Sequence, residues 1–173
     1  MENIFRDLKS NEIDVRISTV TENGLSLLLY KDARVDQNIL DETYRPFGWQ
    51  RDHKELKGNI YCGISIFDKE KQMWVTKWDC GKESFSEAEK GEASDSFKRA
   101  GFNWGIGREL YTAPFIWIPA EQCNIYTNKQ GKLNCNDKFY VEAIQITNKV
   151  ITGLAIKNSR TNTRVFLYKK GDK

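Results

Sequence analysis

Lysine, arginine and serine recur at helical spacing in the middle of the chain, and together they suit the chemistry of phosphate binding. Lys90, Ser94 and Lys98 follow one another every four residues, which places them on one strip of a helix. Arg99 lies further round, and the short side chain of Ser94 lets a polymer backbone approach. Lysine and arginine side chains spaced in this way can bind successive phosphates. The alternative is a solvated outer face on which Asp95 pairs with Arg99.

The helix that must position these cations has its own sequence signals. Its apolar side chains fall on one side, at i, i+4, i+7 and i+11: Ala93, Phe97, Ala100 and Trp104. Ser86 followed by Glu89 matches a capping box at the start. We expect one amphipathic helix over residues 90–111.

The remaining segments predict an antiparallel sheet and a second helix. Residues 31–44 have the pattern of a helix, which Pro46 ends, and residues 2–9 that of a short helix. Strand-like runs lie at residues 14–21, 25–30, 48–56, 59–67, 72–80, 115–118, 139–147, 150–157 and 164–168, and residues 124–137 suggest a polar loop. This order predicts an α+β fold in which both helices pack on one face of a curved antiparallel β-sheet. Its core is β-β-α-β-β-β-α, and further strands follow it.

The sequence partly resembles two phosphate-binding motifs of nucleotide-binding enzymes but matches neither. Residues 80–84 resemble a P-loop, but Glu83 stands where Ser or Thr should follow Gly-Lys, and Thr76 replaces the first glycine. Gly105 and Gly107 follow a helix, whereas a dinucleotide fingerprint follows a strand. We therefore expect a protein without nucleotide hydrolysis.

The composition of the chain bears on its organisation and location. Its 173 residues and 39% hydrophobic content suggest one domain over residues 1–173, with C-terminal strands at 139–168 and a basic tail at 169–173. Residues 138–173 hold eight Lys or Arg against two acids, which favours local recognition of an anion. The sequence shows neither an apolar stretch of membrane-spanning length nor a signal-peptide pattern, so we expect a cytoplasmic protein.

The cysteines do not have the spacing of metal ligands. Cys62, Cys80, Cys123 and Cys135 are too far apart in sequence for paired zinc ligands, and His53 is the only histidine. We expect no metal and no disulfide, with Cys62 and Cys80 as small buried side chains.

Several motifs together resemble a known family. In chain order they are Arg34-Val35, residues 44–49 (YRPFGW), residues 60–66 (IYCGISI), residues 78–84 (WDCGKES) and residues 98–100 (KRA). This series, within about residues 12–115, is similar to that of the Rad-fifty-two-type single-strand annealing proteins. The FGW and KRA details most resemble the phage-encoded recombinase branch.

The resemblance implies both a function and a set of binding residues. Members bind single-stranded DNA and anneal complementary strands without ATP, in homologous recombination and repair, here for a phage or prophage in a bacterial host cell. Arg34, Lys98 and Arg99 match family positions that contact phosphates in an inner groove, and Lys90 matches a lysine upstream. The resemblance implies no enzyme, no catalytic residue and no cofactor. It also implies a homo-oligomeric ring or arc, with an exonuclease or single-strand-binding protein as a possible partner.

Two further cations are DNA-binding candidates because of their position alone. Lys82 and Arg108 flank the central helix, and an ordinary surface charge is an equal alternative for each. For Arg34, the alternative is a pair within its own helix with Asn38 or Asp41.

The chain also departs from the family pattern. Phe102 stands where eukaryotic members tend to carry another arginine, so one phosphate contact is in doubt unless Arg108 replaces it. The connection from Glu83 to Lys90 is shorter than in those members, and a second, outer DNA site is left open.

Two other classes of protein are alternatives. A passive single-strand binder of the OB-fold kind would show five strands with one helix, whereas this pattern has two substantial helices. A metal-dependent nuclease would use acidic clusters, but Glu89, Glu92 and Asp95 point in different directions around a helix. Base stacking on Phe47 or Trp49 is possible, but we expect both rings to pack in the core.

Overall fold

The computed structural model describes residues 4–81 and 88–171 and separates the chain into two compact units. Unit 1 comprises residues 1–6 and 32–108, and unit 2 comprises residues 7–31 and 109–173. Each unit therefore combines segments that are distant in sequence. The organisation into a single DNA-annealing domain over residues 1–173 stays a prediction.

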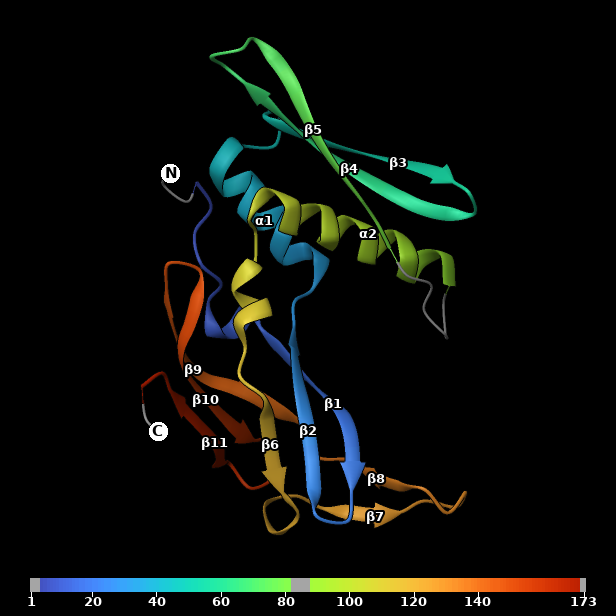
Figure 1. The fold of residues 1–173 in the computed structure, drawn as a ribbon, viewed down its shortest axis with the longest axis vertical. Coiled ribbons are helices and arrows are strands. Elements are labelled where there is room, and N and C mark those ends of the chain that lie inside the picture. Colours follow the sequence, from blue (N-terminus) through green and yellow to red (C-terminus); the bar gives the residue numbers. More distant parts are fainter. Residues whose placement is uncertain (1–3, 82–87, 172–173) are drawn as a thin grey trace. The chain divides into compact units, whose positions relative to one another are not determined.

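In unit 1, two helices lie on one side of a three-stranded antiparallel sheet (Figure 1). The strands follow chain order: β3 (Trp49–Leu56), β4 (Asn59–Asp68) and β5 (Met73–Cys80). The helices are α1 (Ala33–Tyr44) and α2 (Ala88–Trp104), which contains the predicted cation strip. Helix α2 packs on β4 and β5, and α1 packs on α2.

Alternating side chains explain why α2 and the sheet bury each other. Strand β4 turns every second side chain towards the helix, and each of these is at most 4% exposed: Cys62, Ile64 and Ile66. Phe97 and Ala100 meet them from α2 and are 1% and 0% exposed. Trp104 closes the contact by donating a hydrogen bond from Nε1 to the Ile64 carbonyl at 2.8 Å. The predicted apolar stripe is confirmed at these three positions of α2.

Both helices differ from the sequence prediction at a boundary: α1 at its start and α2 at its end. Helix α1 begins at Ala33 because the Asp32 carboxylate accepts a hydrogen bond from the Arg34 amide as the N-cap. Helix α2 ends at Trp104, well before the predicted residue 111, because Gly105 has φ 104° and turns the chain out of the helix. A short 3-10 helix, η2 (Arg108–Thr112), follows it.

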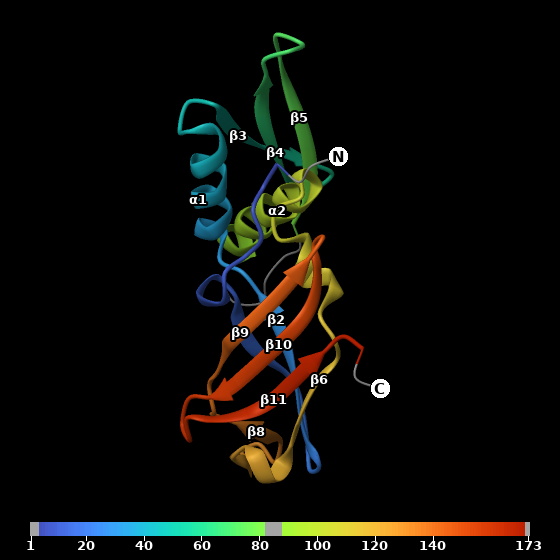
Figure 2. The same ribbon diagram turned by 90° about the vertical axis from the view of Figure 1, so that its left-hand side faces the viewer.

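Unit 2 is built around a six-stranded antiparallel sheet in the order β11-β10-β9-β1-β2-β6 (Figure 2). The strands are β1 (Asp14–Thr21), β2 (Gly24–Tyr30), β6 (Ile116–Pro119), β9 (Phe139–Thr147), β10 (Val150–Asn158) and β11 (Thr163–Lys169). The outermost strands β6 and β11 also lie side by side, so the sheet curls towards closure. Its inner face is almost fully buried: Leu25, Leu27, Ile116, Ile118, Leu154 and Ile156.

The α+β class with antiparallel, curved sheets is confirmed, although the strands divide between the two units. The predicted polar loop at residues 124–137 contains a hairpin of β7 (Ile125–Thr127) and β8 (Leu133–Cys135), joined by a turn around Gly131. The predicted short helix at residues 2–9 is wrong over its described part, residues 4–9, and two short 3-10 helices, η1 (Ser10–Glu12) and η3 (Ala120–Gln122), occur elsewhere. Within the described residues, no helix is long and apolar enough to cross a membrane.

The prediction that Phe47 packs in the core is wrong. Trp49 packs against Phe97 with ring centroids 6.2 Å apart, as expected, but Phe47 is 96% exposed because it lies in the turn between α1 and β3.

Of the two cysteines predicted to be buried, one is buried and one is not. Cys62 is buried, and burial raises the pKa of its thiol to about 11. Cys80 is only half-buried because it pairs with Tyr61 on the sheet face away from α2.

The close approach of α1 and α2 gives a stability prediction. A Cβ built at Gly101 of α2 would overlap the carboxylate of Asp36, which is fully buried on α1. Glycine to alanine within a helix normally stabilises by about 1 kcal/mol. We expect Gly101→Ala instead to lower the free energy of unfolding by about 1–3 kcal/mol in urea titrations, because the helices must separate. A gain in stability would contradict this packing.

Candidate nucleic-acid interface

Two of the predicted phosphate contacts act on one carboxylate. Asp32, the N-cap of α1, accepts hydrogen bonds from the Arg34 guanidinium at Nε (2.8 Å) and Nη2 (3.3 Å). The charge of Lys98 on α2 is the smallest of the causes that lower the pKa of Asp32, so it acts on this carboxylate from a distance. We call Asp32, Arg34 and Lys98 together the Asp32 cluster.

The arginine of this cluster is open to solvent. The hydrogen bonds from Arg34, then the charges of Arg34 and Lys98, hold the pKa of Asp32 below its usual range, so the carboxylate stays ionised. The Arg34 side chain is 82% exposed. A phosphate can approach this arginine without prior unfolding, and Asp32 holds the guanidinium in place until it does.

Arg99 is directed elsewhere. Its Nε lies 3.3 Å from Oδ1 of Asp79 on β5, and the two side chains are 37% and 24% exposed. Asn103 also donates to Asp79, at 3.3 Å, and thereby fixes the carboxylate. Arg99 is thus held at the sheet, whereas its neighbour Lys98 lies about 100° further round the helix.

Arg108 lies just beyond the C-terminal end of α2 and binds the last carbonyls of that helix. Its guanidinium donates to the carbonyls of Phe102 (2.6 Å) and Asn103 (2.9 Å). Lys77 of β5 also donates to the Asn103 carbonyl at 3.0 Å, and its ammonium lies 4.4 Å from the centre of the Trp104 ring. The last carbonyls of a helix otherwise have no partner, so both cations stabilise this end. A DNA-binding role for Arg108 stays a prediction.

Two predicted contacts are not placed by the structure. Lys82 and the predicted capping box residue Ser86 lie outside the described residues, and Lys90 lies on α2 but its side chain is not described. Sequence reasoning overlooked the two carboxylates that orient the arginines, Asp32 and Asp79. Asp32 had a usable signal, since aspartate directly before a helical run is a common N-cap.

Of the acidic residues considered for a nuclease, Glu92 has a structural partner. It is 4% exposed and accepts a hydrogen bond from the Ile60 amide at 2.6 Å, which ties α2 to β4. Within residues 4–81 and 88–171, no three His, Cys, Asp or Glu side chains form a cluster suited to a metal ion.

Comparison with known proteins identifies the family. The chain matches the family described as "Rad52/22 family double-strand break repair protein" over residues 1–130. It therefore belongs to the Rad52/22 family, a family of DNA-binding proteins of recombination and repair that anneal single strands. No curated protein and no solved structure matches the chain. The predicted family is confirmed, and the phage-encoded branch stays a prediction.

The contacts of Arg108 lead to a testable distinction between capping and binding. We expect Arg108→Ala to lower the free energy of unfolding by about 1 kcal/mol, because two helix carbonyls lose charged donors. Arg34→Ala, which removes an exposed ion pair, should change stability by less than about 0.5 kcal/mol. Urea denaturation of both variants measures the difference. Equal stabilities would show that Arg108 does not support the helix end.

Proposed function

We propose that this protein binds single-stranded DNA and anneals complementary strands without ATP. The observation that carries the proposal is the cluster of Arg34 and Lys98 around Asp32, in a chain of the Rad52/22 family. Two cations that the family resemblance singled out separately both act on the carboxylate of Asp32, and the Arg34 side chain is exposed. Phosphate contacts of this kind are independent of base sequence, as annealing requires.

Annealing needs no chemical energy from the protein. Base stacking releases on the order of 1.4 kcal/mol per step when a duplex forms, so the protein only has to hold a strand with its base edges accessible. Cations that contact phosphates leave the base edges free for pairing. In this proposal Lys98 and Arg34 contact phosphates directly, and Arg99 does so when it is released from Asp79.

A single subunit offers few cations, which favours action in an assembly. The few cations of the Asp32 cluster bind a strand weakly, but many subunits on one strand combine weak contacts into strong binding. We therefore propose a homo-oligomeric ring or arc. We also propose that the protein works for a phage or prophage in the cytoplasm of a bacterial host, with a phage exonuclease or single-strand-binding protein as partner.

A passive single-strand-binding protein is the second candidate. It is favoured by the exposed rings Phe47, 96% exposed, and Trp74, 40% exposed, on which bases can stack. Bases stacked on protein are withheld from pairing, so a passive binder slows annealing, and an annealer accelerates it.

The proposal is tested by annealing two complementary fluorescent oligonucleotides without ATP. We expect the wild type to accelerate pairing and Lys98→Ala/Arg99→Ala to lose roughly tenfold or more in rate, because phosphate contacts are removed. Lys98→Ala alone should retain stability, since its described partner is the exposed Asp32. The melting temperature of each variant verifies that it is folded.

A matched control removes two cations elsewhere. Lys129→Ala/Lys132→Ala changes the charge equally at exposed positions around the β7–β8 turn and should anneal like the wild type. If the wild type binds single strands but slows pairing, the passive binder is the correct function. If the control loses as much rate as Lys98→Ala/Arg99→Ala, overall charge rather than this cluster carries the binding.

A further inference from the structure

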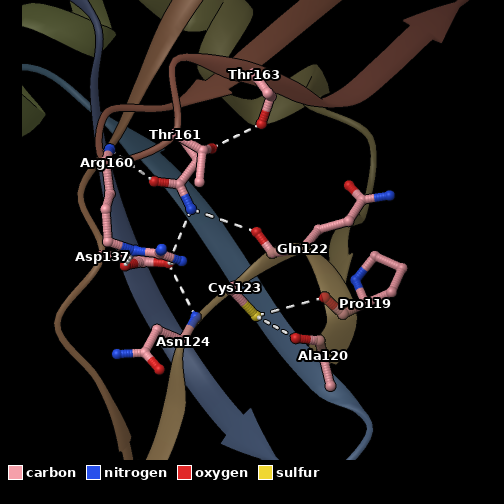
Figure 3. Close-up of polar contacts among 10 residues, drawn as sticks. Pro119, Ala120, Gln122, Cys123, Asn124, Asp137, Arg160, Thr161 and Thr163 are labelled. Carbon is pink, nitrogen blue, oxygen red and sulfur yellow. Dashed lines mark hydrogen bonds and ion pairs between the residues drawn. The ribbon is translucent and has the colours of Figure 1, made fainter.

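A further oriented arginine, Arg160, lies in unit 2 beside the buried carboxylate of Asp137 (Figure 3). Arg160 donates to Asp137 through Nε at 2.6 Å and Nη2 at 3.2 Å. The Asp137 side chain is 2% exposed, and Asn158 and the Asn124 amide donate to it at 2.8 and 2.9 Å. Four hydrogen bonds therefore hold the Asp137 carboxylate in place, and two of them orient the Arg160 guanidinium. Among the described residues, Nη1 of Arg160 has no acceptor, so it is available to a ligand.

Arg164 is held in the same manner by a second carboxylate. Its Nε donates to Glu142 at 2.6 Å, and the ammonium of Lys157 lies 3.0 Å from the same carboxylate. The hydrogen bonds from Arg164 and then Lys157 hold the pKa of Glu142 at about 2, so this carboxylate stays ionised at neutral pH. The Arg160 and Arg164 side chains are 52% and 51% exposed, so both present guanidinium groups to solvent.

Arg160 and Arg164 are both among the residues that line one hollow of the surface. The hollow has a volume of about 360 Å³ and is lined by Arg160, Arg164, Thr161, Thr163 and Gln122, together with Glu121 and Val165. The hydroxyls of Thr161 and Thr163 are 2.7 Å apart and hydrogen-bonded to each other, so the hydroxyl that accepts this bond keeps its own hydrogen for a ligand. Guanidinium groups and a hydroxyl donor are the chemistry that recognises a phosphate oxygen.

The charge of the chain supports an anionic ligand here. Of the 27 Lys and Arg and 24 Asp and Glu, unit 2 holds 13 and 9, and unit 1 holds 14 and 15. Unit 2 therefore carries a net charge of 13 − 9 = +4, whereas unit 1, which contains α2, carries 14 − 15 = −1. A polyanion is attracted to unit 2 more strongly than to the unit with the predicted DNA contacts.

We propose that the Arg160–Arg164 hollow binds a backbone phosphate of single-stranded nucleic acid, as a phosphate contact additional to the Asp32 cluster. The proposal rests on the proposed function and gives it a second site on the same chain. Both arginines follow residue 130, so they lie outside the part of the chain that matches the family. The family match therefore does not itself imply this site.

The salt dependence of binding tests this site. For single strands, each lost phosphate contact reduces the slope of log K against log salt by about 0.7. With fluorescent oligo-dT, we expect Arg164→Ala to weaken binding several-fold and flatten the slope by about that amount. Arg164→Lys should restore most of the slope, because it keeps the charge. Arg160→Ala is measured beside them with its melting temperature, since it leaves Asp137 without its main partner.

The outcomes separate this inference from the proposed function. Lys129→Ala/Lys132→Ala removes two exposed cations from the same unit and should leave the slope unchanged. If the wild type anneals and Arg164→Ala retains its affinity and slope, the hollow is not a phosphate site, although the proposed function stands. If the wild type neither binds nor anneals single strands, both proposals are wrong.

Discussion

The packing of α2 on β4 is the contact on which the candidate interface of unit 1 depends. Phe97 and Ala100 are almost fully buried against this strand, and complete burial of a side chain such as Phe97 contributes about 1.5–3 kcal/mol. The hydrogen bond from Trp104 to the Ile64 carbonyl fixes the helix along its axis. With rotation and position fixed, Arg99 faces Asp79 on β5, and Lys98 is turned away from that contact. A helix without this anchor would present both cations to solvent in no defined direction.

Both units contain arginines whose guanidinium group is held by a carboxylate. Arg34 pairs with Asp32, Arg99 with Asp79, Arg160 with Asp137 and Arg164 with Glu142. Exposed ion pairs contribute little to stability, so their number says little about how the fold is maintained. Their physical effect is on geometry, because a guanidinium already held in one orientation loses less conformational freedom when a phosphate arrives. The same carboxylates reduce the local positive charge, which keeps each single contact weak.

Weak contacts suit a protein that must bind a strand and then release it as duplex. Tight binding at any one position would oppose the rearrangement of the strand that pairing requires, whereas many weak contacts can be exchanged one at a time. The small net charges of the two units, −1 for unit 1 and +4 for unit 2, agree with weak binding of a strand. Binding by such a surface is sensitive to salt and indifferent to base sequence.

The sequence by itself determined the elements of this protein and its family. The apolar spacing of Phe97, Ala100 and Trp104 specified α2, and alternation specified most strands, because these patterns are local and period-dependent. The motifs of residues 34–100 identified the Rad52/22 family, within which Arg34 and Lys98 were already candidates.

Only the tertiary structure decided which side chains meet. That the charge of Lys98 reaches Asp32, that Arg99 pairs with Asp79 and that Arg108 binds helix carbonyls all follow from the packing of segments distant in the chain or beyond a helix end. The division of the strands into two units and the exposure of Phe47 have the same origin. A sequence pattern states which face of an element is apolar, but the partner of each polar side chain depends on how the elements pack.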